Sequence, residues 1–142
     1  MAKLNKVLIT FFLMIAAFQA QAQESIEGIW LTEDGNSKVE IYQKNGNYFG
    51  KIVWLKQPVD KNGDRMKDLN NPNRALKNRP ILGIDLLKDL KIKSGKWYGQ
   101  IYAPKRGLGL DVVIIGLGKE KLEITISYRG FTRKQIWTKS TL

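Results

Sequence analysis

The sequence of 142 residues contains no cysteine, no histidine and only four prolines. Without cysteine, disulfides cannot hold the fold, so an apolar core must stabilise it. A lipid-modified N-terminal cysteine is also excluded, and we therefore expect a soluble product. Without histidine, the chain lacks the commonest metal ligand and the usual general base at neutral pH. Serine hydrolase chemistry is thereby disfavoured, and no metal or other cofactor is predicted.

The sequence also lacks an apolar run long enough for a membrane span. Its longest, Val7–Phe18, covers twelve predominantly apolar residues, whereas about 20 are needed to cross the hydrocarbon of a bilayer. Lys3 and Lys6 precede this run, and Ala20-Gln21-Ala22 follows it in the small-x-small pattern that signal peptidase reads. We predict a signal peptide at residues 1–22 and an exported domain, periplasmic or secreted, at residues 23–142.

The excess of basic residues is large: the formal charge is +11, and removal of Lys3 and Lys6 leaves +9. Such a charge suggests anionic partners, which outside the cytoplasm would be lipid headgroups, cell-wall polymers or small acidic molecules rather than nucleic acid. The alternative is that the charge only keeps the protein soluble. The sequence leaves both open.

Alternating apolar and polar residues indicate about eight strands joined by short turns. The first and last, Ser25–Leu31 and Thr132–Thr138, each carry a tryptophan and lie near the two ends of the mature chain. If these two strands pair, the meander between them closes into a barrel without a free edge. We predict an all-β, up-and-down antiparallel barrel, with a sandwich as the alternative.

Two stretches fit this pattern less well. Residues 56–80 are rich in proline and asparagine, and predict a long loop, with one helical turn at Pro72–Lys77 capped by Asn71. Long ordered loops in compact domains are often functional. Residues 81–93 fit a strand, but their apolar positions also fit a helical period, and both assignments stay open.

Several motifs together resemble known families. Gly28-Ile29-Trp30 resembles the Gly-x-Trp signature of lipocalin-type barrels, in which an arginine of the last strand, here Arg133, covers the tryptophan. More closely, the chain resembles the DUF2147 family of exported bacterial proteins. The matching stretches, which span nearly the whole mature chain, are Gly28-Ile29-Trp30, Gly50-Lys51-Ile52-Val53, Asp68 with Asn70-Asn71-Pro72, Arg79-Pro80-Ile81-Leu82-Gly83, Ile101-Tyr102-x-Pro104, Gly107, and Arg133-x-Gln135-x-Trp137-Thr138. This resemblance implies a lipocalin-like barrel outside the cytoplasm but no particular activity.

The chain departs from the family pattern in two places. Leu108-Gly109-Leu110 stands where the family has lysine and tyrosine soon after the glycine matching Gly107. The stretch before the last strand is shortened to Tyr128–Phe131. If these stretches shape a ligand entrance, this chain's specificity differs from that of its relatives.

The spacing of acidic residues in the long loop first suggests a calcium site. Asp60, Asn62 and Asp64 supply oxygens on alternate residues, but the glycine and glutamate that complete a calcium loop are missing. A solvated turn is the better interpretation. In the same loop, Asp68 could form a structural network with Arg74 and Arg79, or these arginines could face an anionic ligand.

Aromatic and basic residues supply the remaining candidates for a ligand site. Trp30 and Trp137 are expected to plug one end of the barrel, whereas Trp54 and Tyr102 are candidates for a ligand wall. The further candidates for an anionic ligand group are basic: Arg74, Arg79, Lys105 and Arg106.

Three functions follow from these features. The first is an exported lipocalin-like protein that binds a small apolar or amphipathic molecule, with an anionic ligand as one form of this function. The second is a basic module, without a cavity, that docks electrostatically on the membrane or on envelope polymers. The third, and least supported, is an enzyme that uses the loop carboxylates. The sequence does not determine the ligand, the partner or the oligomeric state.

Overall fold

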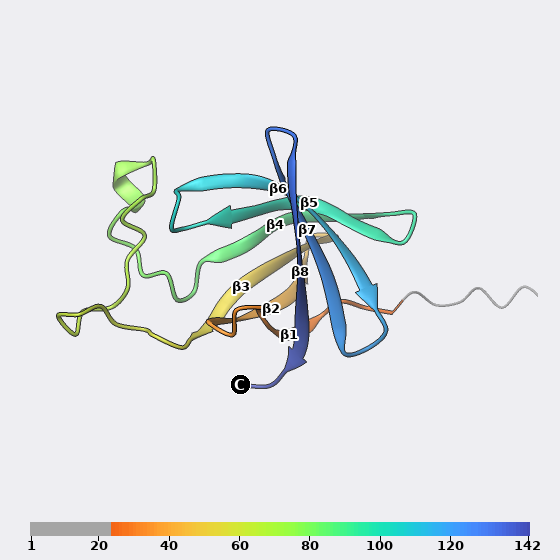
Figure 1. Cartoon of the computed structure of the whole chain (residues 1–142), viewed down its shortest axis with the longest axis horizontal. Coiled ribbons are helices and arrows are strands. Elements are labelled where there is room, and N and C mark those ends of the chain that lie inside the picture. The colour runs from red at the N-terminus through yellow and green to blue at the C-terminus, as the bar shows by residue number, and fades with distance from the viewer. Residues whose placement is uncertain (1–23) are drawn as a thin grey trace, which may run out of the picture.

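The structure, a computed structural model, describes residues 24–142, so the predicted signal peptide lies outside the described residues. Eight antiparallel strands follow one another around a closed barrel (Figure 1). The strands are β1 (Gly28–Leu31), β2 (Ser37–Lys44), β3 (Asn47–Leu55), β4 (Asp85–Lys93), β5 (Lys96–Ala103), β6 (Leu108–Leu117), β7 (Lys121–Tyr128) and β8 (Phe131–Ser140). The predicted all-β barrel is confirmed, and the sandwich alternative is wrong.

The two ends of the described chain seal the barrel, as the sequence predicted. Ile29, Trp30 and Leu31 of β1 pair with Ser140, Lys139 and Thr138 of β8. β1 is short, with four residues against ten in β8. The seal therefore covers only the C-terminal part of β8, and the rest of this strand extends past the end of β1.

The residues assigned ambiguously as strand or helix form a strand. β4 begins at Asp85, and the helical alternative for residues 81–93 is wrong. The strand is irregular: Asp89 has a φ of 51°, and the register with β5 shifts between Lys88 and Lys91. This bulge places Leu87 and Leu90, three residues apart, both in the core.

Side chains of all eight strands and of Ile26 meet in one apolar core. Its fully buried members include Trp30 and Trp137, each 1% exposed, which lie near the place where β1 meets β8. The alternation that predicted β7 explains how the core forms, because Leu122 and Ile124 are buried whereas Glu123 and Thr125 are not.

The connection between β3 and β4 is long and stands away from the barrel (Figure 1). It contains a single 3-10 turn, η1 (Arg74–Leu76), inside the predicted helical stretch. The cap is Asn73, whose side chain accepts from the backbone N–H of Ala75, and not Asn71 as predicted. Asn71 is 5% exposed, and its side chain donates instead to the carboxylate of Asp68. Within residues 24–142, no helix is long and apolar enough to cross a bilayer.

Candidate ligand site at the loop end of the barrel

The barrel has two different ends. The four connections β1–β2, β3–β4, β5–β6 and β7–β8 lie at one end, which we call the loop end. The other end, where Ser140 pairs beside Ile29, carries the remaining three turns, β2–β3, β4–β5 and β6–β7, and is called the terminal end. The tryptophans at the seal fill the terminal end, so any space for a ligand must be sought at the loop end.

Apolar side chains line the inside of the loop end without being fully buried. Leu55, Ile81, Leu110 and Ile126 come from four parts of the chain and pack, partly exposed, on the core. Opposite Ile126 in the register is Arg133, on the face of β8 that also carries Trp137. The loop end thus combines a half-buried apolar floor with a cation at its rim.

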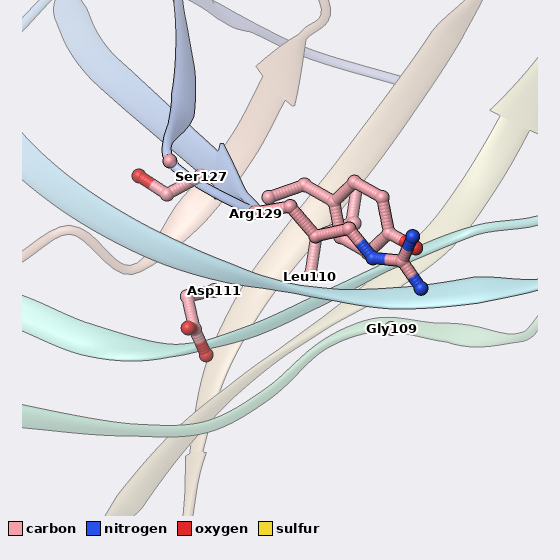
Figure 2. A pocket seen from close by; sticks show the side chains of 7 residues that line it. Gly109, Leu110, Asp111, Ser127 and Arg129 are labelled. Carbon is pink, nitrogen blue, oxygen red and sulfur yellow. The ribbon is translucent and has the colours of Figure 1, made fainter.

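A hollow of about 350 Å³ opens at this end, between the start of β6 and the β7–β8 turn. Its lining consists of two short stretches, Gly109–Asp111 and Ser127–Gly130. Arg129 extends its guanidinium along Leu110, whereas the Asp111 carboxylate points away from that guanidinium (Figure 2). The ring of Tyr128 lies 5.1 Å from the Arg129 guanidinium carbon. The hollow therefore offers apolar surface and a positive charge in one place.

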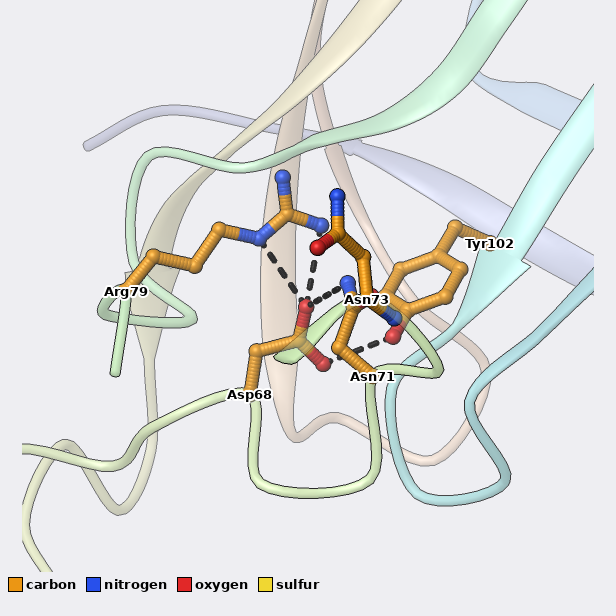
Figure 3. A network of polar contacts seen from close by, with 5 residues as sticks. All are labelled: Asp68, Asn71, Asn73, Arg79 and Tyr102. Carbon is orange, nitrogen blue, oxygen red and sulfur yellow. Dashed lines mark hydrogen bonds and ion pairs between the residues drawn. The ribbon is translucent and has the colours of Figure 1, made fainter. Parts of the chain in front are cut away.

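A second polar feature joins the long loop to the barrel wall and is centred on Asp68, which is fully buried. Tyr102 of β5 donates its hydroxyl to Asp68 Oδ1 at 2.7 Å. Asn71 Nδ2 and Arg79 Nε donate to Oδ2 at 2.8 and 2.9 Å (Figure 3). Arg79 Nη2 lies 2.9 Å from the same oxygen. Asn71 in turn accepts from the backbone of Asn73.

These contacts set the pKa values of the two ionisable partners. Burial raises the pKa of Asp68, but the hydrogen bonds from Asn71, Tyr102 and Arg79 outweigh it and hold that pKa below its usual 3.8. Burial, together with the hydrogen bond to Asp68, raises the pKa of the Tyr102 hydroxyl. Asp68 thus stays ionised and Tyr102 protonated at neutral pH, which is the arrangement of a structural clamp.

The structure unites only some of the residues proposed as ligand contacts. Arg79 and Tyr102 are neighbours in the Asp68 network, where the guanidinium carbon lies 5.7 Å from the ring. Arg74, one residue after the η1 cap, is exposed and stands apart from that network. Lys105 and Arg106 are exposed in the β5–β6 turn, where Asn70 Nδ2 donates to the carbonyl of Lys105.

Trp54 lies outside the barrel. The register of β2 and β3 shifts between Lys38 and Val39, so that Trp54 pairs with Lys38 although Ile52 pairs with the buried Val39. The indole is 36% exposed, and Lys38 Nζ lies 5.3 Å from its ring. The strict alternation expected for β3 placed Trp54 with Ile52, and the irregularity reverses the face.

The cation that covers Trp30 is Lys139. The resemblance to lipocalin-type barrels had implied Arg133 instead. Lys139 pairs with Trp30 in the register, and its Nζ lies 4.5 Å from the ring. The same Nζ donates to the carbonyl of Glu27, beside Gly28. Arg133 lies farther along β8, beyond the end of β1, and is exposed.

The Asp60–Asp64 stretch forms a compact turn. Asp60 Oδ1 accepts from the backbone N–H groups of Asn62 and Asp64 at 2.8 and 3.1 Å, so this carboxylate already serves the loop itself. In the described residues, no group of three or more acidic, histidine or cysteine side chains could hold a metal ion.

The residues that sequence reasoning did not select as ligand contacts are those of the hollow, above all Leu110, Tyr128 and Arg129. A signal was present, because the two departures from the family pattern, Leu108–Leu110 and Tyr128–Phe131, supply most of the lining. Their meeting in space depends on the pairing of β6, β7 and β8, in which Asp111 lies opposite Ser127.

Comparison with known proteins identifies the family. The profile of DUF2147, described as an uncharacterized protein conserved in bacteria, matches residues 28–139. The chain belongs to the DUF2147 family. Its fold is similar to that of protein HP1028 from the human pathogen Helicobacter pylori, which is described as belonging to the lipocalin family. The TM-score is 0.68 at 26% identity, over 82% of this chain and 84% of the other. No curated protein matches the sequence significantly.

Proposed function

We propose that this DUF2147 protein is an exported carrier of a small amphipathic molecule with an anionic end, held at the loop end of its lipocalin-like barrel. The observation that carries the proposal is the hollow of about 350 Å³, where the apolar surface of Leu110 and Tyr128 meets the Arg129 guanidinium. The likeness to a lipocalin-family structure supports a small-molecule role.

The size of the hollow limits the ligand. Pockets for small molecules usually measure about 300–1,000 Å³, so this one suits a short ligand. An eight-stranded barrel has room for its own side chains or for one small molecule. Because Trp30, Trp97 and Trp137 are each at most 2% exposed, the ligand would lie at the rim rather than deep inside.

The charges at the rim select the polar end of the ligand. Arg129 lines the hollow, and Arg133 stands opposite the half-buried Ile126 on the neighbouring strand. Because Asp111 points away from Arg129, that guanidinium is available to a carboxylate, sulfate or phosphate group (Figure 2). The apolar part of the ligand would rest on Leu110.

Titration with octyl sulfate, an amphipathic anion, tests the proposal by isothermal calorimetry. We expect Arg129→Gln to weaken binding by about tenfold, the loss of one charge-assisted contact. Arg106→Gln, an exposed arginine in the β5–β6 turn, is the matched control and should bind as the parent does. Neutral octyl glucoside should bind more weakly than octyl sulfate. Equal affinities of parent and Arg129→Gln would refute this site.

Export is a separate part of the proposal and rests on Val7–Phe18 followed by Ala20-Gln21-Ala22. N-terminal sequencing of the protein recovered from the envelope of an expressing bacterium should give a start near Gln23. A product that keeps Met1 and stays in the cytoplasm would contradict export without affecting the ligand site.

The well-filled core favours one alternative, an envelope-docking module that holds no ligand. It predicts that the protein sediments with vesicles of anionic lipid, and that high salt abolishes this because it screens exposed charges. Sedimentation of this kind, with no calorimetric binding of octyl sulfate, would favour docking over carriage.

A further inference from the structure

The first part of β8 has an open edge. On one side of β8, β7 pairs with Phe131–Thr138. On the other side, β1 pairs only with Thr138–Ser140. Within residues 24–142, no strand pairs with Phe131–Trp137 on the side that faces β1. The β7–β8 hairpin accordingly projects from the barrel (Figure 1).

The direction of the backbone amides along this edge follows from two hydrogen bonds. Lys139 N donates on the β7 side, to the carbonyl of Glu120, whereas Ile136 N donates on the β1 side, to Glu33 Oε1 at 3.0 Å. Backbone groups alternate along a strand, so the N–H and C=O groups of Thr132 and Lys134 also face the β1 side. Glu33 closes this edge at Ile136, and the open part consists of Thr132 and Lys134.

Charge decides which strand could pair there. Residues Ser127–Gln135 include Arg129, Arg133 and Lys134 and no acidic residue. A salt bridge of 3.4 Å to Glu123 offsets Lys134 in part, but its side chain is 69% exposed. A second copy of β8 would bring like charges together across the new pair, which is unfavourable. An acidic segment would be attracted instead.

We propose that the open edge of β8 binds an extended acidic segment of a partner protein by strand addition. Main-chain hydrogen bonds to Thr132 and Lys134 would hold the segment, and Arg129, Arg133 and Lys134 would select its acidic side chains. Phe131, which is 81% exposed, offers an apolar contact at the start of the edge. This edge shares Arg129 and Arg133 with the rim of the ligand hollow. Its backbone contacts at Thr132 and Lys134 lie outside the lining of the hollow, so strand addition does not depend on the proposed ligand.

An NMR titration of the isotope-labelled protein with an alternating threonine–glutamate heptapeptide tests the proposal. We expect the amides of Thr132 and Lys134 to shift and to become protected from hydrogen exchange. A threonine–lysine heptapeptide should not bind. Added salt should weaken binding of the acidic peptide because the selecting charges are exposed.

Two variants separate backbone pairing from charge. Lys134→Pro removes an edge N–H without removing a bond to β7, and should weaken binding by about tenfold. Lys134→Glu keeps the N–H, reverses the charge and should weaken binding to a similar extent; it tests the proposal even if the proline variant fails to fold. Lys121→Glu, on β7 away from the open edge, is the control.

Three outcomes would overturn the proposal. The first is that the acidic peptide leaves Thr132 and Lys134 unchanged, and the second is that both peptides bind equally. The third is that these amides are protected without peptide in a concentration-dependent dimer, which would assign the edge to a second copy of the chain.

Discussion

The residue that ties the long loop to the barrel is Asp68, a buried carboxylate held by three side-chain donors from Asn71, Arg79 and Tyr102. Its partners come from the loop and from β5, so the network fixes one relative to the other. The same geometry argues against catalysis by Asp68, because Tyr102 and Arg79 engage both carboxylate oxygens.

Replacement of Asp68 by asparagine should therefore destabilise the fold. Asparagine carries no charge and one carbonyl oxygen instead of two, so Arg79 would lose its charge partner and one of the two sets of donors would face an NH2 group, at a cost of about 3 kcal/mol. Urea denaturation measures this loss. Asp64→Asn changes an exposed carboxylate of the same loop and should stay within about 0.5 kcal/mol of the parent. Equal effects of the two changes would show that the network carries no stability.

Acid should remove the contribution of Asp68. Its pKa in the folded protein is below 3.8, so the stabilisation is present above that value and is lost as the pH falls through the folded pKa. Denaturation midpoints measured below pH 4 should therefore fall less steeply in Asp68→Asn than in the parent. Parallel acid profiles for the two proteins would contradict this assignment.

Gly107 lies at a position that has no room for a side chain. Its φ is +63°, and a Cβ there would overlap the backbone carbonyl of Asn70. Gly107→Ala should cost about 2 kcal/mol or more in thermal denaturation, because the loop cannot retreat while Asp68 holds it. Gly118→Ala is the control that measures backbone strain alone, since Gly118 has a φ of +69° but no atom within 4 Å of its Cβ position. It should cost only about 1 kcal/mol.

Among the elements, β8 has a sealed part, Thr138–Ser140, which pairs with β1, and an open part before it. Hydrogen exchange of the free protein should show the division residue by residue. We expect rapid exchange at Thr132 and Lys134, whose amides face the β1 side, and slow exchange at Arg133 and Gln135, whose amides face β7. Slow exchange at all four would mean that the edge is covered in the free protein.

Strand irregularities also act at the scale of elements. The bulge at Asp89 puts Leu87 and Leu90 on one side, and the register shift opposite Val39 turns Trp54 outward. In both cases one extra residue reverses the face of those that follow. Alternation in the sequence predicted the strands but could not locate these shifts, so Trp54 was expected in a ligand wall.

The whole molecule depends on one apolar core, which the seal between β1 and β8 encloses. Trp137→Ala would empty a site that is 1% exposed, and should cost about 4 kcal/mol in urea denaturation. Trp54→Ala removes the same side chain from the outer surface and should cost less than about 1 kcal/mol. A similar loss for both variants would mean that closure at the terminal end does not set the stability of the barrel.

The sequence by itself determined the barrel. Eight alternating segments, short turns and a tryptophan near each end sufficed, because a strand with one buried face records that burial in every second residue. The Gly-x-Trp motif and its companions further identified the family. Arg79 could also be singled out from sequence, since long loops in a compact domain are uncommon and often functional. Tyr102 was singled out as an aromatic residue for a ligand wall, and not as a partner of Asp68.

Only the tertiary structure decided which residues face one another across the barrel. Gly109–Asp111 and Ser127–Gly130 meet because β6 pairs with β7 in one register, and Lys139 rather than Arg133 covers Trp30 because the register of β1 and β8 places Lys139 beside it. Strand lengths, registers and bulges are set by packing over the whole core and not by local pattern. For that reason the hollow and the open edge of β8 became visible only in the folded chain.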